Sequence, residues 1–171
     1  MIQNVLIIKI AAIGDVAKAL PLLTFFKEKN PDVKITWVVG RIAAPLVVAT
    51  GLVDRVITVD EKRLFRGSVW QKGKEVVAVW KKLLMHSFDL VITAHPDPRY
   101  LWLARGVRKR EHRYFSRKQE RPSPIPGRCR TQEYLRLCGA ENTYAYSFPK
   151  LRAPEELRWF AERVYHLAAS L

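Results

Sequence analysis

VLIIKIAAIGDV, residues 5–16, is the stretch that decides the fold of this chain. The apolar run at 4–10 is continuous rather than alternating, which is typical of a strand buried on both faces of a parallel sheet. A turn containing Gly14 and Asp15 follows, and then a helix is expected at 16–29. Ligands of α/β proteins usually bind beyond the carboxyl ends of the strands. The sequence therefore places a lysine, Lys9, and the carboxylate of Asp15 where a ligand is expected.

The rest of the chain alternates between strand and helix patterns. Segments that are charged or rich in proline are expected to be loops, at 60–70 and 116–127. Regular alternation of this kind predicts an α/β fold with a single Rossmann-like, doubly wound parallel sheet. Further strands are expected at 33–39, 55–59, 88–94 and 110–115, and further helices at 42–50, 72–86, 99–105, 131–138 and 154–169.

Charge is the strongest signal in the composition. The 171 residues carry a formal net charge of +14. Eleven Lys or Arg and two Glu lie between Arg99 and Arg130, which gives that segment a charge of +9. Such a segment attracts nucleic acid, anionic lipid head groups or a phosphorylated substrate, although a solvated basic face without a ligand is the alternative. No apolar run reaches the roughly 18 residues of a membrane span, no signal peptide is recognisable, and two cysteines indicate a reducing compartment.

Several sequence motifs are absent, and this reduces the kinds of binding and catalytic site that are expected. The first turn lacks the G-x-G-x-x-G and P-loop patterns, so a dinucleotide or P-loop site is not expected. No spacing of His, Cys or acidic residues suits a metal, and no serine lies in a nucleophile motif. Aromatic residues such as Trp102 and Tyr114 within the basic segment could stack on bases, but core packing explains them equally and no nucleic-acid motif is present. We therefore predict no cofactor and no metal, and nucleic acid is disfavoured as a partner.

Asp15, His95 and Asp97 are the polar side chains expected at one edge of the sheet. By spacing alone, Asp15 is more typical of a helix cap than of a catalytic base. His95 and Asp97 follow the expected strand at 88–94, where a turn stabilised by the Asp97 side chain is the alternative to a ligand site.

Five segments, in order, resemble the bacterial ADP-heptose:lipopolysaccharide heptosyltransferases, which are inverting B-type glycosyltransferases. The segments are VLIIKIAAIGDVAKALPLL (5–23), PDVKITWVVG (31–40), VDRVITVD (53–60), FDLVITAHPDPR (88–99) and RTQEYLRLCGA (130–140). The resemblance implies the N-terminal half of the B-type fold, with an acceptor-binding domain at 1–150. It further implies that 151–171 is a linker helix leading to a donor-binding domain absent from the chain, so that the chain is expected to be inactive alone.

The resemblance also implies a reaction. A heptose or another sugar passes from a nucleotide-sugar such as ADP-heptose to a phosphorylated lipopolysaccharide inner-core acceptor, with Asp15 as general base. This chemistry is expected in the cytoplasm, at the inner-membrane surface. A non-catalytic binding module for anionic glycolipid or nucleic acid is the alternative. Candidate acceptor-binding residues are Lys9, Gly14, Lys62, Arg63, Arg66, His95, Asp97 and Arg99.

Overall fold

A parallel sheet forms the centre of the molecule. The computed structural model describes residues 2–95, 97, 99–115, 126–141 and 143–152. Its five strands, all parallel to their neighbours, lie in the order β3-β2-β1-β4-β5. The predicted α/β fold is confirmed. In chain order the strands are β1 (Asn4–Ile8), β2 (Lys34–Gly40), β3 (Arg55–Val59), β4 (Ser87–Thr93) and β5 (Arg108–Tyr114).

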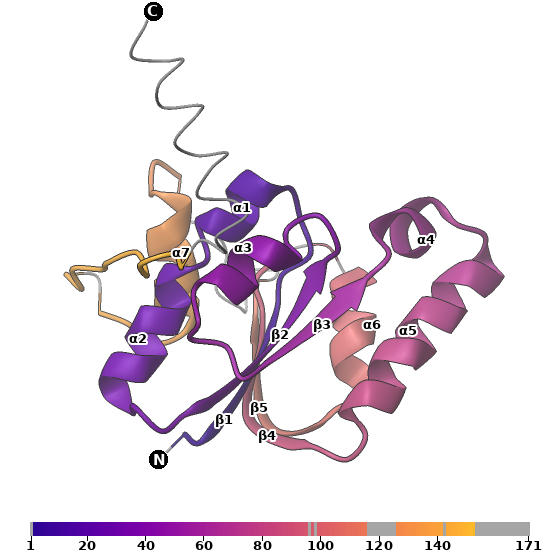
Figure 1. Ribbon diagram of the computed structural model, residues 1–171, viewed down its shortest axis with the longest axis horizontal. Helices are drawn as coiled ribbons and strands as arrows, with labels where there is room; N and C mark the ends of the chain where they lie inside the picture. Colours follow the sequence, from indigo (N-terminus) through magenta and orange to yellow (C-terminus); the bar gives the residue numbers. More distant parts are fainter. Residues whose placement is uncertain (1, 96, 98, 116–125, 142, 153–171) are drawn as a thin grey trace, which may run out of the picture.

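Helices cover both faces of this sheet (Figure 1). Alternate residues of β1 point to the two faces, so Val5 and Ile7 join one apolar core while Leu6 and Ile8 join the other. One face is covered by α1 (Ile13–Ala17), α2 (Pro21–Lys29), α3 (Ala44–Ala49) and α7 (Arg130–Leu137), and the other by α4 (Glu61–Arg66), α5 (Val69–Leu83) and α6 (Arg99–Arg105). The doubly wound arrangement expected from the sequence is therefore present.

The helix expected at 16–29 is wrong in one respect, because two helices occupy this stretch. α1 ends at Ala17, and α2 begins with Pro21 in its first turn. A proline inside a helix lacks an N–H and clashes with the carbonyl four residues earlier, here that of Ala17. The proline therefore separates a short helix at the sheet edge from the longer one that packs on the sheet.

The loop expected at 60–70 is also wrong. α4 occupies most of it, and the Asp60 carboxylate caps this helix by accepting a hydrogen bond from the backbone N–H of Arg63 (3.1 Å). α5 then begins at Val69 rather than Lys72, because Ser68 and Gln71 form a capping box. The helix expected at 154–169 lies outside the described residues, as do 116–125 of the second expected loop and 153–171 of the expected linker.

Within the described part of the chain, every helix falls short of the length and apolar character that crossing a bilayer requires. This agrees with the absence of a long apolar run in the sequence.

Gly106 permits the close contact between α5 and α6. A Cβ atom there would lie 2.5 Å from the Trp80 indole, whose Nε1 donates to the carbonyls of Trp102 and Leu103 (both 3.1 Å). Because the indole is fixed by these bonds, we expect Gly106→Ala to lower the free energy of unfolding by about 1–3 kcal/mol in urea denaturation. Gly73, inside α5, has open space beside it, so Gly73→Ala is expected to raise this free energy by up to about 1 kcal/mol. Equal effects of the two substitutions would contradict this packing.

Candidate active site

The carboxyl ends of β1 and β4 form the switch point of the sheet. The chain passes from β1 through β2 to β3 at one edge, and β4 and β5 then extend the sheet on the other side of β1. The loops that follow the neighbouring strands β1 and β4 therefore lead to opposite faces. In open α/β sheets, ligands bind in the crevice that such loops leave. The predicted polar residues of 9–15 and 95–99 follow these two strands.

Asp15 lies in the first turn of α1. Ala12 is the N-cap residue and no side chain caps this helix, so the interpretation of Asp15 as a helix cap is wrong. The helix begins earlier than expected, and this leaves the carboxylate free of backbone capping. Asp15 instead forms an ion pair with Lys18 (3.7 Å), and both side chains are about half exposed to solvent (49% and 55%). A substrate at the sheet edge can therefore reach this carboxylate.

Lys9 is buried, with 2% of its surface exposed, and lies close enough to Asp15 for their charges to interact. Its Nζ lies 4.9 Å from the centre of the Tyr134 ring, which faces it from α7. Among the described residues, Lys9 has no carboxylate at ion-pair distance. Burial lowers the pKa of Lys9 to about 8, while the nearby charge of Asp15 acts in the opposite direction. The site thus contains a buried amine that can gain or lose a proton close to neutral pH.

His95 follows β4 at the same edge of the sheet. Its ring stacks on Tyr100 of α6, with centroids 4.2 Å apart, and its Nδ1 accepts a hydrogen bond from the backbone N–H of Asp97 (3.1 Å). Burial lowers the pKa of His95, and the positive charge of Lys9 lowers it further. His95 is therefore mainly a neutral ring at pH 7.

Asp97 and Arg99 pair with each other. The Arg99 guanidinium donates to both carboxylate oxygens of Asp97 at 2.5–3.0 Å, and the Arg99 backbone N–H donates to Oδ1 at 2.9 Å. These bonds lower the pKa of Asp97. Asp97 thus stabilises its own loop, as the turn interpretation predicts. The guanidinium of Arg99 also lies 4.9 Å from the centre of the Phe65 ring, which connects this loop to α4.

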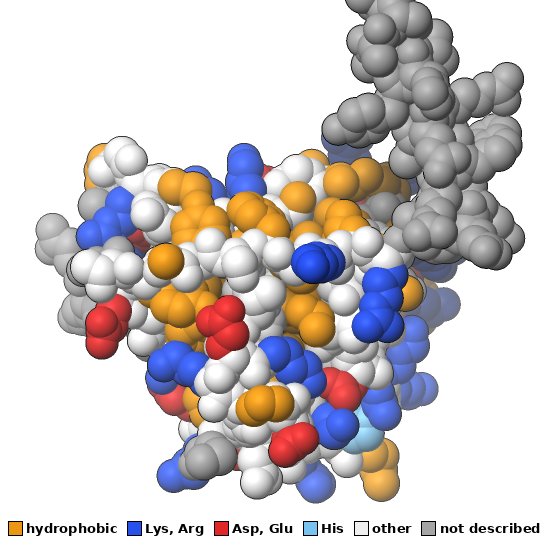
Figure 2. All heavy atoms as spheres, turned by 60° about the vertical axis from the view of Figure 1, so that its left-hand side comes forward, with side chains coloured by type: hydrophobic (Ala, Val, Ile, Leu, Met, Phe, Trp, Pro, Cys, Tyr) orange, Lys and Arg blue, Asp and Glu red, His pale blue; other side chains and the backbone are white. Residues whose placement is uncertain are grey.

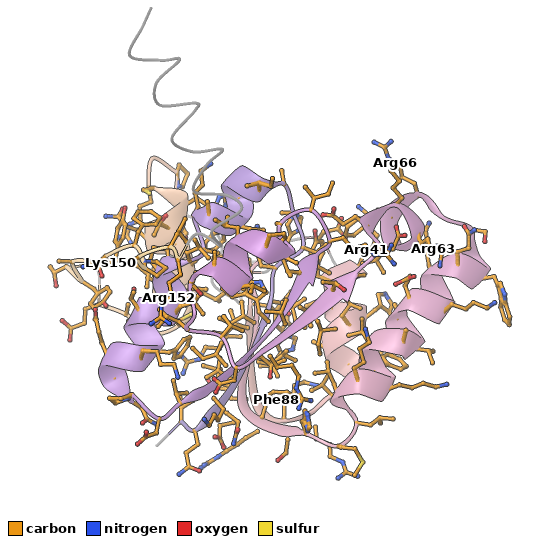
Figure 3. The ribbon with its side chains drawn as sticks, viewed as in Figure 1. Arg41, Arg63, Arg66, Phe88, Lys150 and Arg152 are labelled. Atoms are coloured by element: carbon orange, nitrogen blue, oxygen red, sulfur yellow. The ribbon has the colours of Figure 1, made fainter. Side chains whose placement is uncertain are left out.

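The cations of α4 form a second group at the same edge, on the side of β3. Arg63 forms ion pairs with Asp60 (3.7 Å) and Glu75 (3.8 Å), whereas Lys62 and Arg66 are exposed. Figure 3 shows Arg63 and Arg66 together with Arg41 beyond the ends of β2 and β3. The predicted residues thus fall into two groups, one at the switch point and one on α4.

Gly14 is the remaining predicted site residue. No atom of the described chain lies within 4 Å of where its Cβ would be, and its φ is not positive. Neither packing nor backbone conformation within the described residues requires a glycine here. Its lack of a side chain keeps the backbone beside Asp15 open to solvent.

No family model matches this chain. Among curated proteins, it is similar to lipopolysaccharide heptosyltransferase 1 of Pseudomonas aeruginosa, with 33% identity over 109 residues, which are 63% of the chain and 30% of that protein. It is also similar to the lipopolysaccharide core heptosyltransferase OpsX of Haemophilus influenzae, with 25% identity over 119 residues, which are 70% of the chain and 32% of that protein. The resemblance of this chain to the lipopolysaccharide heptosyltransferases is therefore confirmed. The chain spans about a third of the length of these two curated relatives.

Solved structures show the same fold. A glycosyl transferase family 9 protein from Veillonella parvula superposes with a TM-score of 0.77 and 18% identity, over 98% of the chain and 49% of that structure. The E. coli heptosyltransferase WaaC with ADP superposes with a TM-score of 0.68 and 23% identity, over 86% of the chain and 49% of that structure. These likenesses support the Rossmann-like domain expected of a B-type glycosyltransferase.

Sequence reasoning missed three residues at this edge of the sheet. The Tyr100 hydroxyl donates to the carbonyl of Ile10, so Tyr100 connects the loops after β1 and β4. Tyr134 faces Lys9, and burial together with the negative charge of Asp15 raises the pKa of Tyr134 to about 12. Arg41 pairs with Asp60 (3.7 Å) at the base of α4. No local pattern marks these residues, because their partners are distant in sequence.

The basic segment has a structural role in part. β5 is an edge strand, and charged side chains on an edge hinder pairing with another chain. One of these cations, Arg113, is also paired with Glu111 (2.6 Å). Lys and Arg side chains are exposed elsewhere too, across the flank turned forward in Figure 2. Positive charge alone therefore does not locate a ligand on this molecule.

No group of three or more His, Cys, Asp or Glu side chains that could hold a metal occurs among the residues that the structure describes. The switch point itself contributes a carboxylate, a buried amine, a neutral imidazole and nearby cations.

Proposed function

We propose that this chain is the acceptor-binding part of a glycosyltransferase that transfers a heptose or another sugar from a nucleotide-sugar to a phosphorylated lipopolysaccharide inner-core acceptor. The observation that carries the proposal is the position of Asp15 at the switch point, half exposed and close to the buried Lys9. The names of the curated relatives support the reaction class. The non-catalytic alternative, a binding module for anionic glycolipid or nucleic acid, requires no base at this position.

Asp15 acts as the general base in this proposal. It removes the proton from an acceptor hydroxyl while the oxygen attacks the anomeric carbon of the donor sugar. A carbon–oxygen bond to the acceptor forms, and the bond to the nucleotide diphosphate breaks on the opposite face, so that the configuration inverts. A carboxylate is a weak base at neutral pH, so its contribution comes from alignment with the hydroxyl. The open backbone at Gly14 lets the acceptor come close enough for this alignment.

Lys9 and His95 support Asp15 in this proposal. A charged Lys9 contributes positive potential toward an acceptor phosphate. His95 is held by Tyr100 and by the Asp97 backbone, so it presents a fixed polar ring to the acceptor sugar. The Asp97–Arg99 pair keeps this loop in place.

Acceptor phosphates and carboxylates are proposed to bind the cations of α4. We expect Lys62→Gln combined with Arg66→Gln to weaken binding of a phosphorylated inner-core oligosaccharide by roughly tenfold, because hydrogen bonds to charged groups contribute about 1.5–3 kcal/mol each when well formed and less when exposed. Isothermal titration calorimetry would measure this change. The matched control is Lys150→Gln, since Lys150 lies on the opposite side of the molecule (Figure 3) and should leave affinity unchanged. An equal loss in both variants would indicate non-specific charge attraction.

The other partners are proposals of the same kind. We infer a division into an acceptor-binding domain at 1–150 and a linker at 151–171. The nucleotide-sugar is then bound as a substrate by a donor-binding domain, and no cofactor or metal is invoked. Because the proposed acceptor is linked to lipid, we infer that the transfer takes place at the cytoplasmic face of the inner membrane. The test is transfer from ADP-heptose to a Kdo-lipid A acceptor by this chain with a donor-binding domain supplied as a separate polypeptide. Acceptor binding without any transfer would favour the non-catalytic alternative.

A further inference from the structure

We propose that the outward side of α5 docks on an anionic lipid bilayer. The residues of this surface, which we name the α5 stripe, are Trp70, Lys74, Val77, Lys81 and Leu84. Their spacings of three, four and seven residues place them on one side of the helix. Leu84 directly follows the last residue of α5 as its C-cap. The surface therefore extends along the whole helix.

The α5 stripe is strongly exposed although much of it is apolar. Trp70 is 73% exposed and Leu84 is 52% exposed, and the adjoining Met85 is 88% exposed. The opposite side of the helix contributes Val79 and Leu83 to the core. The helix therefore packs on the domain without using the α5 stripe. An exposed side of such a helix is normally polar, and a contiguous apolar surface there indicates a partner.

Charge identifies a lipid surface rather than a protein as this partner. Lys74 and Lys81 lie among the apolar residues, and the Lys74 Nζ lies 5.2 Å from the centre of the Trp70 ring. Lysine is depleted in protein interfaces, whereas lysine beside tryptophan is typical of helices that lie in the membrane interface. The acidic residue of α5, Glu75, is paired with Arg63 at 3.8 Å. The stripe can thus insert apolar groups while its ammonium groups reach lipid phosphates.

The position of the helix suits this role. α5 lies at the outer margin of the molecule, in the layer that it shares with α4 and α6 (Figure 1). In the same layer, α6 exposes Trp102, whose ring has the Arg105 guanidinium 5.3 Å from its centre. The amino-terminal end of α5 adjoins α4. A bilayer on the α5 stripe would therefore bring a lipid-linked acceptor toward the α4 cations, a consequence that rests on the proposed function, whereas lipid binding itself does not.

Vesicle flotation with the whole chain tests the proposal. We expect binding to vesicles of phosphatidylcholine mixed with phosphatidylglycerol, and little binding to phosphatidylcholine alone. Trp70→Ser with Val77→Ser is expected to weaken binding at least about tenfold through lost apolar burial. Lys74→Gln with Lys81→Gln is expected to weaken it roughly 30-fold, since each lysine near an anionic surface contributes about 1 kcal/mol.

The control is Phe148→Ser with Lys150→Gln, an exposed aromatic and an exposed lysine away from α5, which should leave binding within about twofold. Three results would overturn the proposal: no binding by the unaltered chain, unchanged binding in the Trp70 and Val77 variant, or an equal loss in the control. Self-association that the stripe substitutions abolish would also overturn it, in favour of a second copy of the chain. Binding of a lipid-free acceptor oligosaccharide should survive the stripe substitutions, so a failure of this proposal is distinguishable from a failure of the proposed function.

Discussion

Replacing Asp15 with asparagine is expected to lower sugar transfer by about 10²- to 10⁴-fold, the contribution typical of a positioned general base. Asparagine keeps the size and polarity of the side chain but cannot accept the proton of the acceptor hydroxyl. The measurement is the initial rate of transfer from a nucleotide-sugar to the phosphorylated acceptor, with the donor-binding domain supplied.

Structural damage cannot account for such a loss. Asp15 caps no helix, and its pair with Lys18 is exposed, so that pair contributes less than about 1 kcal/mol to stability. Acceptor affinity and the urea midpoint should therefore change little in the variant. Asp32→Asn, at an exposed aspartate between α2 and β2, is the matched control and should transfer at the normal rate. Full activity of Asp15→Asn would exclude Asp15 as the base.

Replacing Lys9 with methionine is expected to stabilise the domain and to weaken acceptor binding. The buried amine of Lys9 has no carboxylate partner at ion-pair distance among the described residues. Burial lowers its pKa from 10.5 to about 8. This corresponds to a cost of up to about 3 kcal/mol at pH 7 for keeping the group charged in the fold. Methionine fills similar space without this cost, so urea denaturation at pH 7 should show a gain of about 1–3 kcal/mol, while acceptor affinity falls.

The gain should depend on pH in a defined direction. Between pH 8 and 10.5 the unfolded chain binds more protons at Lys9 than the folded chain does, so the unaltered protein becomes more stable as pH rises. The advantage of Lys9→Met is therefore full below about pH 8 and fades toward pH 10.5. Lys150→Met, at an exposed lysine, should change stability little at either pH. If Lys9→Met lowered the free energy of unfolding, or raised it by the same amount at every pH, the buried charge of Lys9 would not be destabilising in the way described.

Much of the fold could be predicted from local patterns. The five strands are marked by apolar runs or by their bounding turns, and Gly51 and Gly139, both with positive φ, mark the ends of α3 and α7 as expected. The predicted helix bounds and the predicted loop were wrong where a single residue determines the local structure against the surrounding sequence pattern. Pro21 divides an otherwise continuous helical stretch, and the Asp60 cap produces a helix in a segment too charged to show an apolar period, since Leu64 is its buried residue.

The position of the candidate site at the edge of the sheet could be predicted from the sequence, but the contacts between its residues could not. Lys9, Asp15 and His95 were expected at one edge because parallel strands share a carboxyl edge, but the sequence does not reveal that β1 and β4 are neighbours. Tyr134 and Tyr100 reach this edge from helices that begin far along the chain, so no spacing connects them to Lys9 or Ile10. The cap interpretation of Asp15 failed because it depends on the first residue of α1, which a sequence locates poorly.

An amide NMR titration of this chain with a lipid-free, phosphorylated Kdo oligosaccharide tests the central claim most directly. The claim is that the acceptor binds at the carboxyl edge of β1 and β4, in front of Asp15. We expect saturable shifts concentrated in 9–18, 61–66 and 94–99, which decrease together as added salt weakens binding. No saturable binding, or shifts centred on the flank of α2 and α7, would contradict the claim.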